Sequence, residues 1–118
     1  MSHRIVIAGR VHVAPEKRAA ALKDARPLIE AALAEKGCVE YAWTADPHDP
    51  GIIRVFEEWV SEPDLAVHLK GEPYRGMLAH LSGIGILNAV TQKYRVDHFE
   101  PVYDPQGVPR ADFFTAKE

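Results

Sequence analysis

The chain is most informative at first through what it lacks. A single cysteine, Cys38, excludes an intrachain disulfide and a cysteine-rich metal site. Long apolar runs are missing, because the stretch from Ile5 to Ala8 is too short for a signal peptide or a membrane span. Positive charge is not in excess, since 14 basic residues face 17 acidic ones and the net charge is −3. These absences predict a cytoplasmic protein that binds neither nucleic acid nor a membrane surface.

Motifs for cofactors and metals are missing as well. The sequence has no glycine-rich phosphate loop and no nucleophile motif, and its six histidines are dispersed. His68 and His80 share one helical region but are too far apart to lie on the same face. We therefore expect no cofactor and no metal site.

The patterns that are present predict one α+β domain. Its 118 residues, of which 47% are hydrophobic, suffice for a single core. Alternating apolar residues predict strands over about 3–13, 38–46, 52–60 and 89–97. A helix is expected from Pro15 to Lys36, with a bend at Pro27, and a second helical region after Ser61 breaks near Gly71.

Two finer expectations concern the faces of these elements. In the second strand, alternation places Val39, Tyr41, Trp43 and Ala45 on one face. In the last helix, Met77, Leu78 and Leu81 are expected to point inward.

The element order β-α-β-β-α-β predicts a ferredoxin-like, antiparallel four-stranded sheet over residues 1–98, with the helices on one face. The strands nevertheless carry apolar side chains on both faces, so we expect a homodimer in which a second copy covers the other face. Residues 99–118 are a proline-rich C-terminal extension with Tyr103, Phe113 and Phe114. This extension is either a loose tail or an arm that lies across the partner subunit.

The region from Glu57 to Tyr74 carries the candidate chemistry. Ser61 is placed to cap the helix that follows the third strand, and this turn fixes Trp59 relative to His68. Alternation puts Glu57 on the same face as Trp59. Two interpretations remain open: an aromatic wall and a titratable imidazole of a small-molecule site, or a core tryptophan and a surface histidine beside Asp64.

Several short motifs together resemble those of the antibiotic biosynthesis monooxygenase family. They are Gly37-Cys38-Val39-Glu40-Tyr41, Asp46-Pro47, Glu57-Glu58-Trp59, and His68 followed by Pro73-Tyr74. The resemblance extends over roughly residues 3–98. It implies a dimeric α/β barrel built from ferredoxin-like subunits.

The resemblance further implies a cofactor-independent monooxygenase that acts on a quinol, a phenol or a polyketide-like aromatic in an apolar pocket, with molecular oxygen as co-substrate. On this interpretation His68 is the catalytic base and Tyr74 a second catalytic polar contact. Trp59 and Tyr41 are walls of the pocket, and Glu57 completes the substrate-binding set.

Other functions of the same fold are weighed against this one. A dimeric small-molecule-binding or stress-associated module without turnover is the main alternative, and a solvent-facing His68 would favour it. Haem-degrading relatives carry an asparagine on the first strand and a tryptophan and a histidine ligand further on, whereas this chain has His68 and Leu78 near the latter two places. Haem degradation is therefore disfavoured, and so is sugar-phosphate isomerisation.

Overall fold

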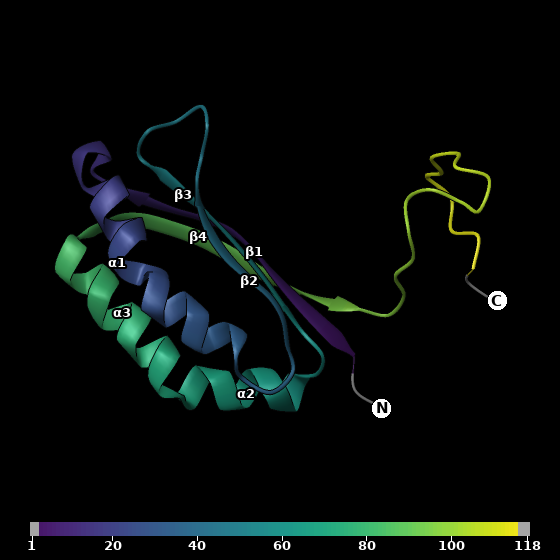
Figure 1. The fold of residues 1–118 in the computed structure, drawn as a ribbon, viewed down its shortest axis with the longest axis horizontal. Helices are drawn as coiled ribbons and strands as arrows, with labels where there is room; N and C mark the ends of the chain where they lie inside the picture. The colour runs from purple at the N-terminus through teal and green to yellow at the C-terminus, as the bar shows by residue number, and fades with distance from the viewer. Residues whose placement is uncertain (1–2, 116–118) are drawn as a thin grey trace.

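The computed structural model describes residues 3–115 and confirms the ferredoxin-like α+β fold. The elements follow one another as β1 (Arg4–Val13), α1 (Pro15–Leu33), β2 (Cys38–Ala45), β3 (Ile52–Trp59), α2 (Glu62–Lys70), α3 (Glu72–Ile84) and β4 (Ile86–Val96). The sheet is antiparallel throughout, in the order β2-β3-β1-β4. Figure 1 shows the helices together on one side of this sheet. No helix in the described range is long and apolar enough to cross a membrane.

Helix α1 runs through Pro27 without interruption but ends at Leu33, three residues before the expected Lys36. The chain leaves the helix in tight turns, in which the amide of Glu35 donates to Ala32 O at 3.0 Å and the amide of Cys38 donates to Glu35 O at 3.2 Å. Gly37 then adopts a positive φ of 81°, which favours glycine because it has no Cβ. This early ending places Glu35 in a turn beside α2 instead of on a solvated helix.

Strand β2 contains an irregularity that the alternation did not reveal. The register with β3 shifts between Cys38 and Glu40, so that Cys38 pairs with Trp59 and Val39 is the extra residue. Cys38 packs against the core, whereas Val39 is exposed. The expectation that Val39 shares a face with Tyr41 is therefore wrong, since Tyr41 is buried on the helix-covered face.

Helices α2 and α3 meet at Gly71, as the sequence indicated. Met77 and Leu81 are buried, but the prediction for Leu78 is wrong, since this side chain is 48% exposed. Residues four apart share a helix face, and the residue directly after Met77 is rotated by about 100° away from that face.

The sheet has one face that no helix within residues 3–115 covers, which we call the open face. Phe56 of β3 is 39% exposed there and Tyr94 of β4 is 50% exposed. The half-buried Val6 and Ala8 of β1 are paired with Tyr94 and Phe56, respectively, and lie between them. The homodimer that would cover this face remains a prediction.

Residues 97–115 follow β4 and project beyond the end of the sheet (Figure 1). The Glu100 carboxylate organises this segment by accepting hydrogen bonds from the amides of Phe114 and Thr115, each at 2.9 Å. An isolated bridge pairs Tyr103 with Pro109. The segment therefore has local order of its own, and its role as a dimer arm remains a prediction.

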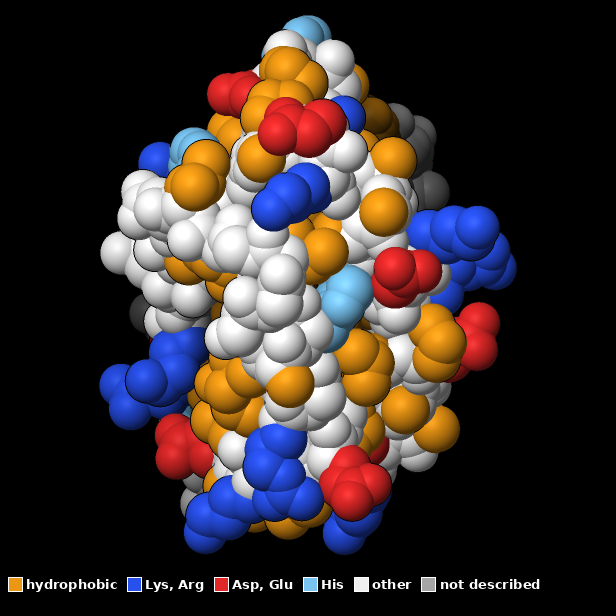
Figure 2. All heavy atoms as spheres, turned by 90° about the vertical axis from the view of Figure 1, so that its left-hand side faces the viewer, with side chains coloured by type: hydrophobic (Ala, Val, Ile, Leu, Met, Phe, Trp, Pro, Cys, Tyr) orange, Lys and Arg blue, Asp and Glu red, His pale blue; other side chains and the backbone are white. Residues whose placement is uncertain are grey.

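Charges of both signs alternate over the surface seen in Figure 2, where basic and acidic side chains lie close to one another. The mixture of both signs on this face agrees with the small net charge of −3.

Candidate functional site

His68 of α2 lies at the centre of an aromatic cluster and is only 1% exposed. Its ring centroid is 4.5 Å from that of Trp59, 5.5 Å from that of Tyr41 and 5.6 Å from that of Tyr74. Glu57 joins the group because its Oε1 accepts a hydrogen bond from Trp59 Nε1 at 3.0 Å. The structure thus brings together all five residues singled out from the sequence, which we call the His68 cluster. The alternative of a surface histidine is wrong.

The start of α2 explains how His68 reaches this position. Ser61 Oγ accepts a hydrogen bond from the amide of Asp64 at 3.2 Å, which satisfies one free amide of the first turn. The amide of Val60 donates to Gly37 O at 2.8 Å and ties this turn to the start of β2. His68 follows in the last turn of α2 and faces inward.

Sequence reasoning missed the partner of His68. Glu35, in the turn after α1, has Oε1 2.6 Å from Nδ1 of His68. A glutamate near the end of a helix is usually solvated, and only its place two residues before the positive-φ Gly37 hinted at a special position. Trp43 was also left out, although alternation placed it beside Tyr41, and its ring centroid lies 6.4 Å from that of Tyr41.

The other nitrogen of the imidazole, Nε2, is buried and has no hydrogen-bond partner among the described residues. Leaving such a group unpaired costs about 1–3 kcal/mol. A residue that bears this cost in a folded protein is a candidate for ligand binding, because a hydrogen-bonding ligand would remove it.

Burial tunes the other polar groups of the cluster. It raises the pKa of Glu57, although the hydrogen bond from Trp59 and the charge of His68 act against that rise. Burial, followed by the charge of Glu57, also raises the pKa of Tyr41, so its phenol stays protonated at neutral pH and can donate a hydrogen bond. Burial raises the pKa of Cys38 to about 11, with a further contribution from Glu57, which leaves a thiol with little nucleophilic character.

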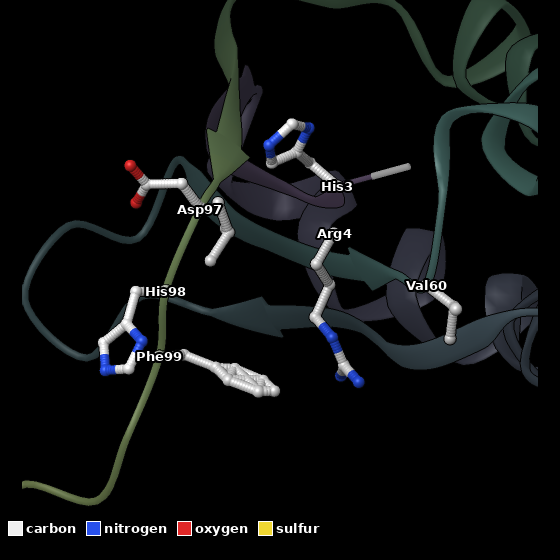
Figure 3. Close-up of a pocket in the computed structure, with 7 residues that line it drawn as sticks. His3, Arg4, Val60, Asp97, His98 and Phe99 are labelled. Carbon is white, nitrogen blue, oxygen red and sulfur yellow. The ribbon is translucent and has the colours of Figure 1, made fainter. Parts of the chain in front are cut away.

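Two hollows lie near the His68 cluster or the start of β1, and only one of them is lined by a residue of the cluster. One, of about 270 Å³, is lined by Glu35, Lys36, Pro63, Asp64, Val67 and His68 and so adjoins the cluster from outside. The other, of about 480 Å³, lies between β1 and the segment after β4, where the Arg4 guanidinium sits 4.6 Å above the Phe99 ring (Figure 3). No residue of the His68 cluster lines this second hollow.

Within residues 3–115, no three side chains of histidine, cysteine, aspartate or glutamate converge in a way that would hold a metal ion. The pair Glu35–His68 supplies only two such groups.

The family model of the antibiotic biosynthesis monooxygenases matches residues 4–79. The chain belongs to this family. The matched range contains Glu35 and the entire His68 cluster, and it ends within α3. No curated protein matches the chain.

Solved structures share the fold of this chain. A conserved protein from Methanosarcina mazei Go1 is 26% identical, with a TM-score of 0.71 over 80% of this chain and 93% of the other. A protein from Deinococcus radiodurans, provisionally named an antibiotic biosynthesis monooxygenase, is 17% identical, with a TM-score of 0.76 over 85% and 99%. A protein of unknown function from Bacteroides thetaiotaomicron, provisionally named an oxidoreductase, is 20% identical, with a TM-score of 0.73 over 81% and 100%. The two neighbours below 25% identity establish the fold alone.

Proposed function

We propose that the chain is a cofactor-independent monooxygenase that oxidises a quinol, phenol or polyketide-like aromatic with molecular oxygen. Family membership supports a monooxygenase-like role that involves binding a small molecule. The observation that carries the finer proposal is the buried, unpartnered Nε2 of His68, surrounded by the rings of Tyr41, Trp59 and Tyr74. Such a group suits an aromatic substrate with an acidic hydroxyl.

The reaction requires the substrate to supply all the electrons. His68 Nε2 accepts the proton of the substrate hydroxyl, and the resulting phenolate is electron-rich enough to reduce oxygen. In a substrate with a methylene group conjugated to the phenolate, one atom of O₂ becomes the carbonyl oxygen that replaces the two methylene hydrogens. The other atom leaves with those two hydrogens as water, so the balance needs no further reductant.

Tyr74 and Tyr41 support this role as hydrogen-bond donors at the rim and in the wall of the cluster. Tyr41 stays protonated because burial raises its pKa, and it can therefore donate to a substrate oxygen. Tyr74 is half-buried and packs edge-on against His68. We propose that it is the second polar contact to the substrate. Trp59 provides an apolar surface whose orientation is held by Glu57.

A binding module without turnover is the second candidate, and one observation favours it. The hollow that adjoins His68 is not a closed apolar cavity, because Glu35, Lys36 and Asp64 form part of its lining. A ligand would therefore have to displace a ring of the cluster or enter from this charged side. A module that only binds a phenol satisfies Nε2 equally well.

Oxygen uptake with a panel of quinols and polyphenols tests the proposal. We expect His68→Ala to reduce the rate by about 10²-fold or more, the usual contribution of a positioned base. His68→Gln preserves bulk in the core and shows whether a folded protein loses the same activity. His48→Ala, in an exposed turn, is the matched control and should retain the wild-type rate.

Equal rates in wild type, His68→Ala and His68→Gln would overturn the catalytic role of His68. Saturable binding of a phenol by the wild-type protein with no oxygen uptake would instead establish the binding module.

A further inference from the structure

The Glu35–His68 contact assigns a specific form to the imidazole. Glu35 Oε1 lies 2.6 Å from Nδ1, with the two side chains 19% and 1% exposed. An ionised carboxylate can only accept a hydrogen bond, so the proton of this contact belongs to Nδ1. The neutral ring then has its lone pair on Nε2, which is the nitrogen without a partner.

The surroundings of Glu35 hold its carboxylate in one place. The backbone on both sides is fixed by the hydrogen bonds of the turn, from Glu35 N to Ala32 O and from Cys38 N to Glu35 O. Its second oxygen, Oε2, lies against Gly71, where an added Cβ would approach it to 3.2 Å. The amide of Gly71 in turn donates to His68 O at 3.0 Å, so the carboxylate and the histidine backbone are anchored at the same junction.

Aromatic rings surround the imidazole, and its Nε2 is buried. Trp59 lies over one side of the imidazole with the two planes 33° apart, while Tyr41 and Tyr74 meet the ring edge-on at 68° and 66°. The ring nitrogens point in diverging directions, so Nε2 points away from Glu35. Rotation of the ring would bring Nδ1 out of contact with its only acceptor among the described residues.

We propose that Glu35 is a positioning residue, which accepts the Nδ1 proton of His68 and thereby presents Nε2 as a hydrogen-bond acceptor to a hydroxylated ligand. This inference rests on the proposed function for the identity of the ligand, but not for the tautomer. Glu35 touches no reacting atom in this scheme and acts through His68. It also stabilises the imidazolium that forms when Nε2 takes a proton.

The tautomer is directly measurable by ¹⁵N–¹H correlation spectra of the histidine ring, at a pH well above the ordinary imidazole value of about 6.5. In the wild type, we expect His68 with the proton on Nδ1. Glu35→Ala removes the acceptor, and the proton should then move to Nε2 in most molecules, as in a free histidine. Glu35→Gln retains an accepting oxygen and should preserve the Nδ1–H form.

Glu30→Ala, an exposed glutamate on α1, is the matched control and should leave the spectrum of His68 unchanged. A wild-type His68 with its proton on Nε2 would overturn the inference. So would an Nδ1–H tautomer that persists in Glu35→Ala. If Glu35→Ala does not fold, Glu35→Asp replaces it, because its shorter side chain withdraws the acceptor from Nδ1. Loss of the Nδ1–H form in folded Glu35→Asp supports the inference. Retention of that form in both Glu35→Asp and Glu35→Gln contradicts it.

Oxygen uptake provides the second readout. With an active substrate, Glu35→Ala should reduce kcat by about 10-fold or more with KM little changed, while Glu35→Gln recovers most of the rate. If the His68 proton moves to Nε2 in Glu35→Ala as expected but the wild type shows no turnover, the role of Glu35 is supported and the monooxygenase is refuted. Turnover that is unaffected by a shifted tautomer would refute the role of Glu35 alone.

Discussion

The two faces of the sheet contrast most clearly within the single strand β3. Ile53, Val55 and Trp59 point toward the helices and are almost fully buried. Phe56, between them, points to the open face and keeps 39% of its surface exposed. Successive side chains of a strand alternate between the two faces of the sheet. Strand β3 therefore contributes both to the buried site under the helices and to the exposed open face. The helix-covered face is buried within this chain, whereas Phe56 and Tyr94 on the open face stay exposed in a single chain.

The largest expected effect is on the oligomeric state, when a charge is introduced on the apolar open face. We propose that the chain forms a homodimer through this face, so light scattering of the wild type should give about twice the 13.1 kDa chain mass. Phe56→Glu would bury an unpaired carboxylate in that interface and should reduce the mass to that of one chain. Leu78→Glu, on an exposed position of α3, is the control and should remain dimeric.

A wild-type protein that is monomeric at micromolar concentration would contradict the dimer. An unchanged mass in Phe56→Glu would place the interface elsewhere. Truncation after residue 98 separates the contribution of the C-terminal extension, because an arm that contacts the partner should strengthen the dimer when present.

The second effect concerns the stability that each face gives to one chain. Trp59→Ala should reduce the free energy of unfolding by about 3–5 kcal/mol, as for other buried aromatic residues. Tyr94→Ala, which removes an aromatic side chain that is 50% exposed on the open face, should cost at most about 1 kcal/mol. Urea unfolding in the Phe56→Glu background measures both without a contribution from dimer dissociation. Similar losses for the two variants would mean that the faces do not differ in this way.

The smallest expected effect is a pH dependence of the free energy of unfolding, which arises from the burial of Glu57 on the helix-covered face. Burial raises the pKa of Glu57 above its ordinary 4.5, so the folded state holds this proton more tightly than the unfolded state. That contribution to stability is complete below pH 4.5 and is lost as the pH rises through the folded pKa. Glu57→Gln should therefore flatten the decline of the unfolding free energy above pH 4.5.

Glu40→Gln is the matched control for this pH dependence, because Glu40 is exposed on the neighbouring strand. It should retain the wild-type slope in urea titrations at a series of pH values. A slope that is identical in wild type and Glu57→Gln would show that Glu57 titrates alike in both states.

The fold was predictable from the sequence because the strands alternate and the turns are rich in proline and glycine. The neighbourhood of Trp59 and His68 was predictable for a related reason, since a capped turn at Ser61 joins their elements over nine residues. The extra residue at Val39 was not predictable, because an alternating pattern carries no mark of a register shift. Glu35 was missed because its role depends on contact with a residue 33 positions away.

The burial of His68 also lay beyond sequence reasoning, which left open whether this side chain belongs to a site or lies on the surface. A histidine near a helix end has no pattern that distinguishes the inner face from the outer one when its apolar neighbours, here Val67 and Leu69, are themselves exposed. The hydrophobic periodicity of a nine-residue helix is too short to decide between them.

The turn at Gly37 limits how this sequence can change over evolution. Its φ of 81° disfavours other residues, and an added Cβ would lie only 2.2 Å from Asp64 Oδ2. Asp64 also contacts Ser61, whose cap begins the helix that carries His68. A side chain at Gly37 is therefore strained by the backbone itself and must also displace the Asp64 carboxylate, which alters the contacts at the start of α2. A change at residue 37 is therefore linked to the start of the helix that carries His68.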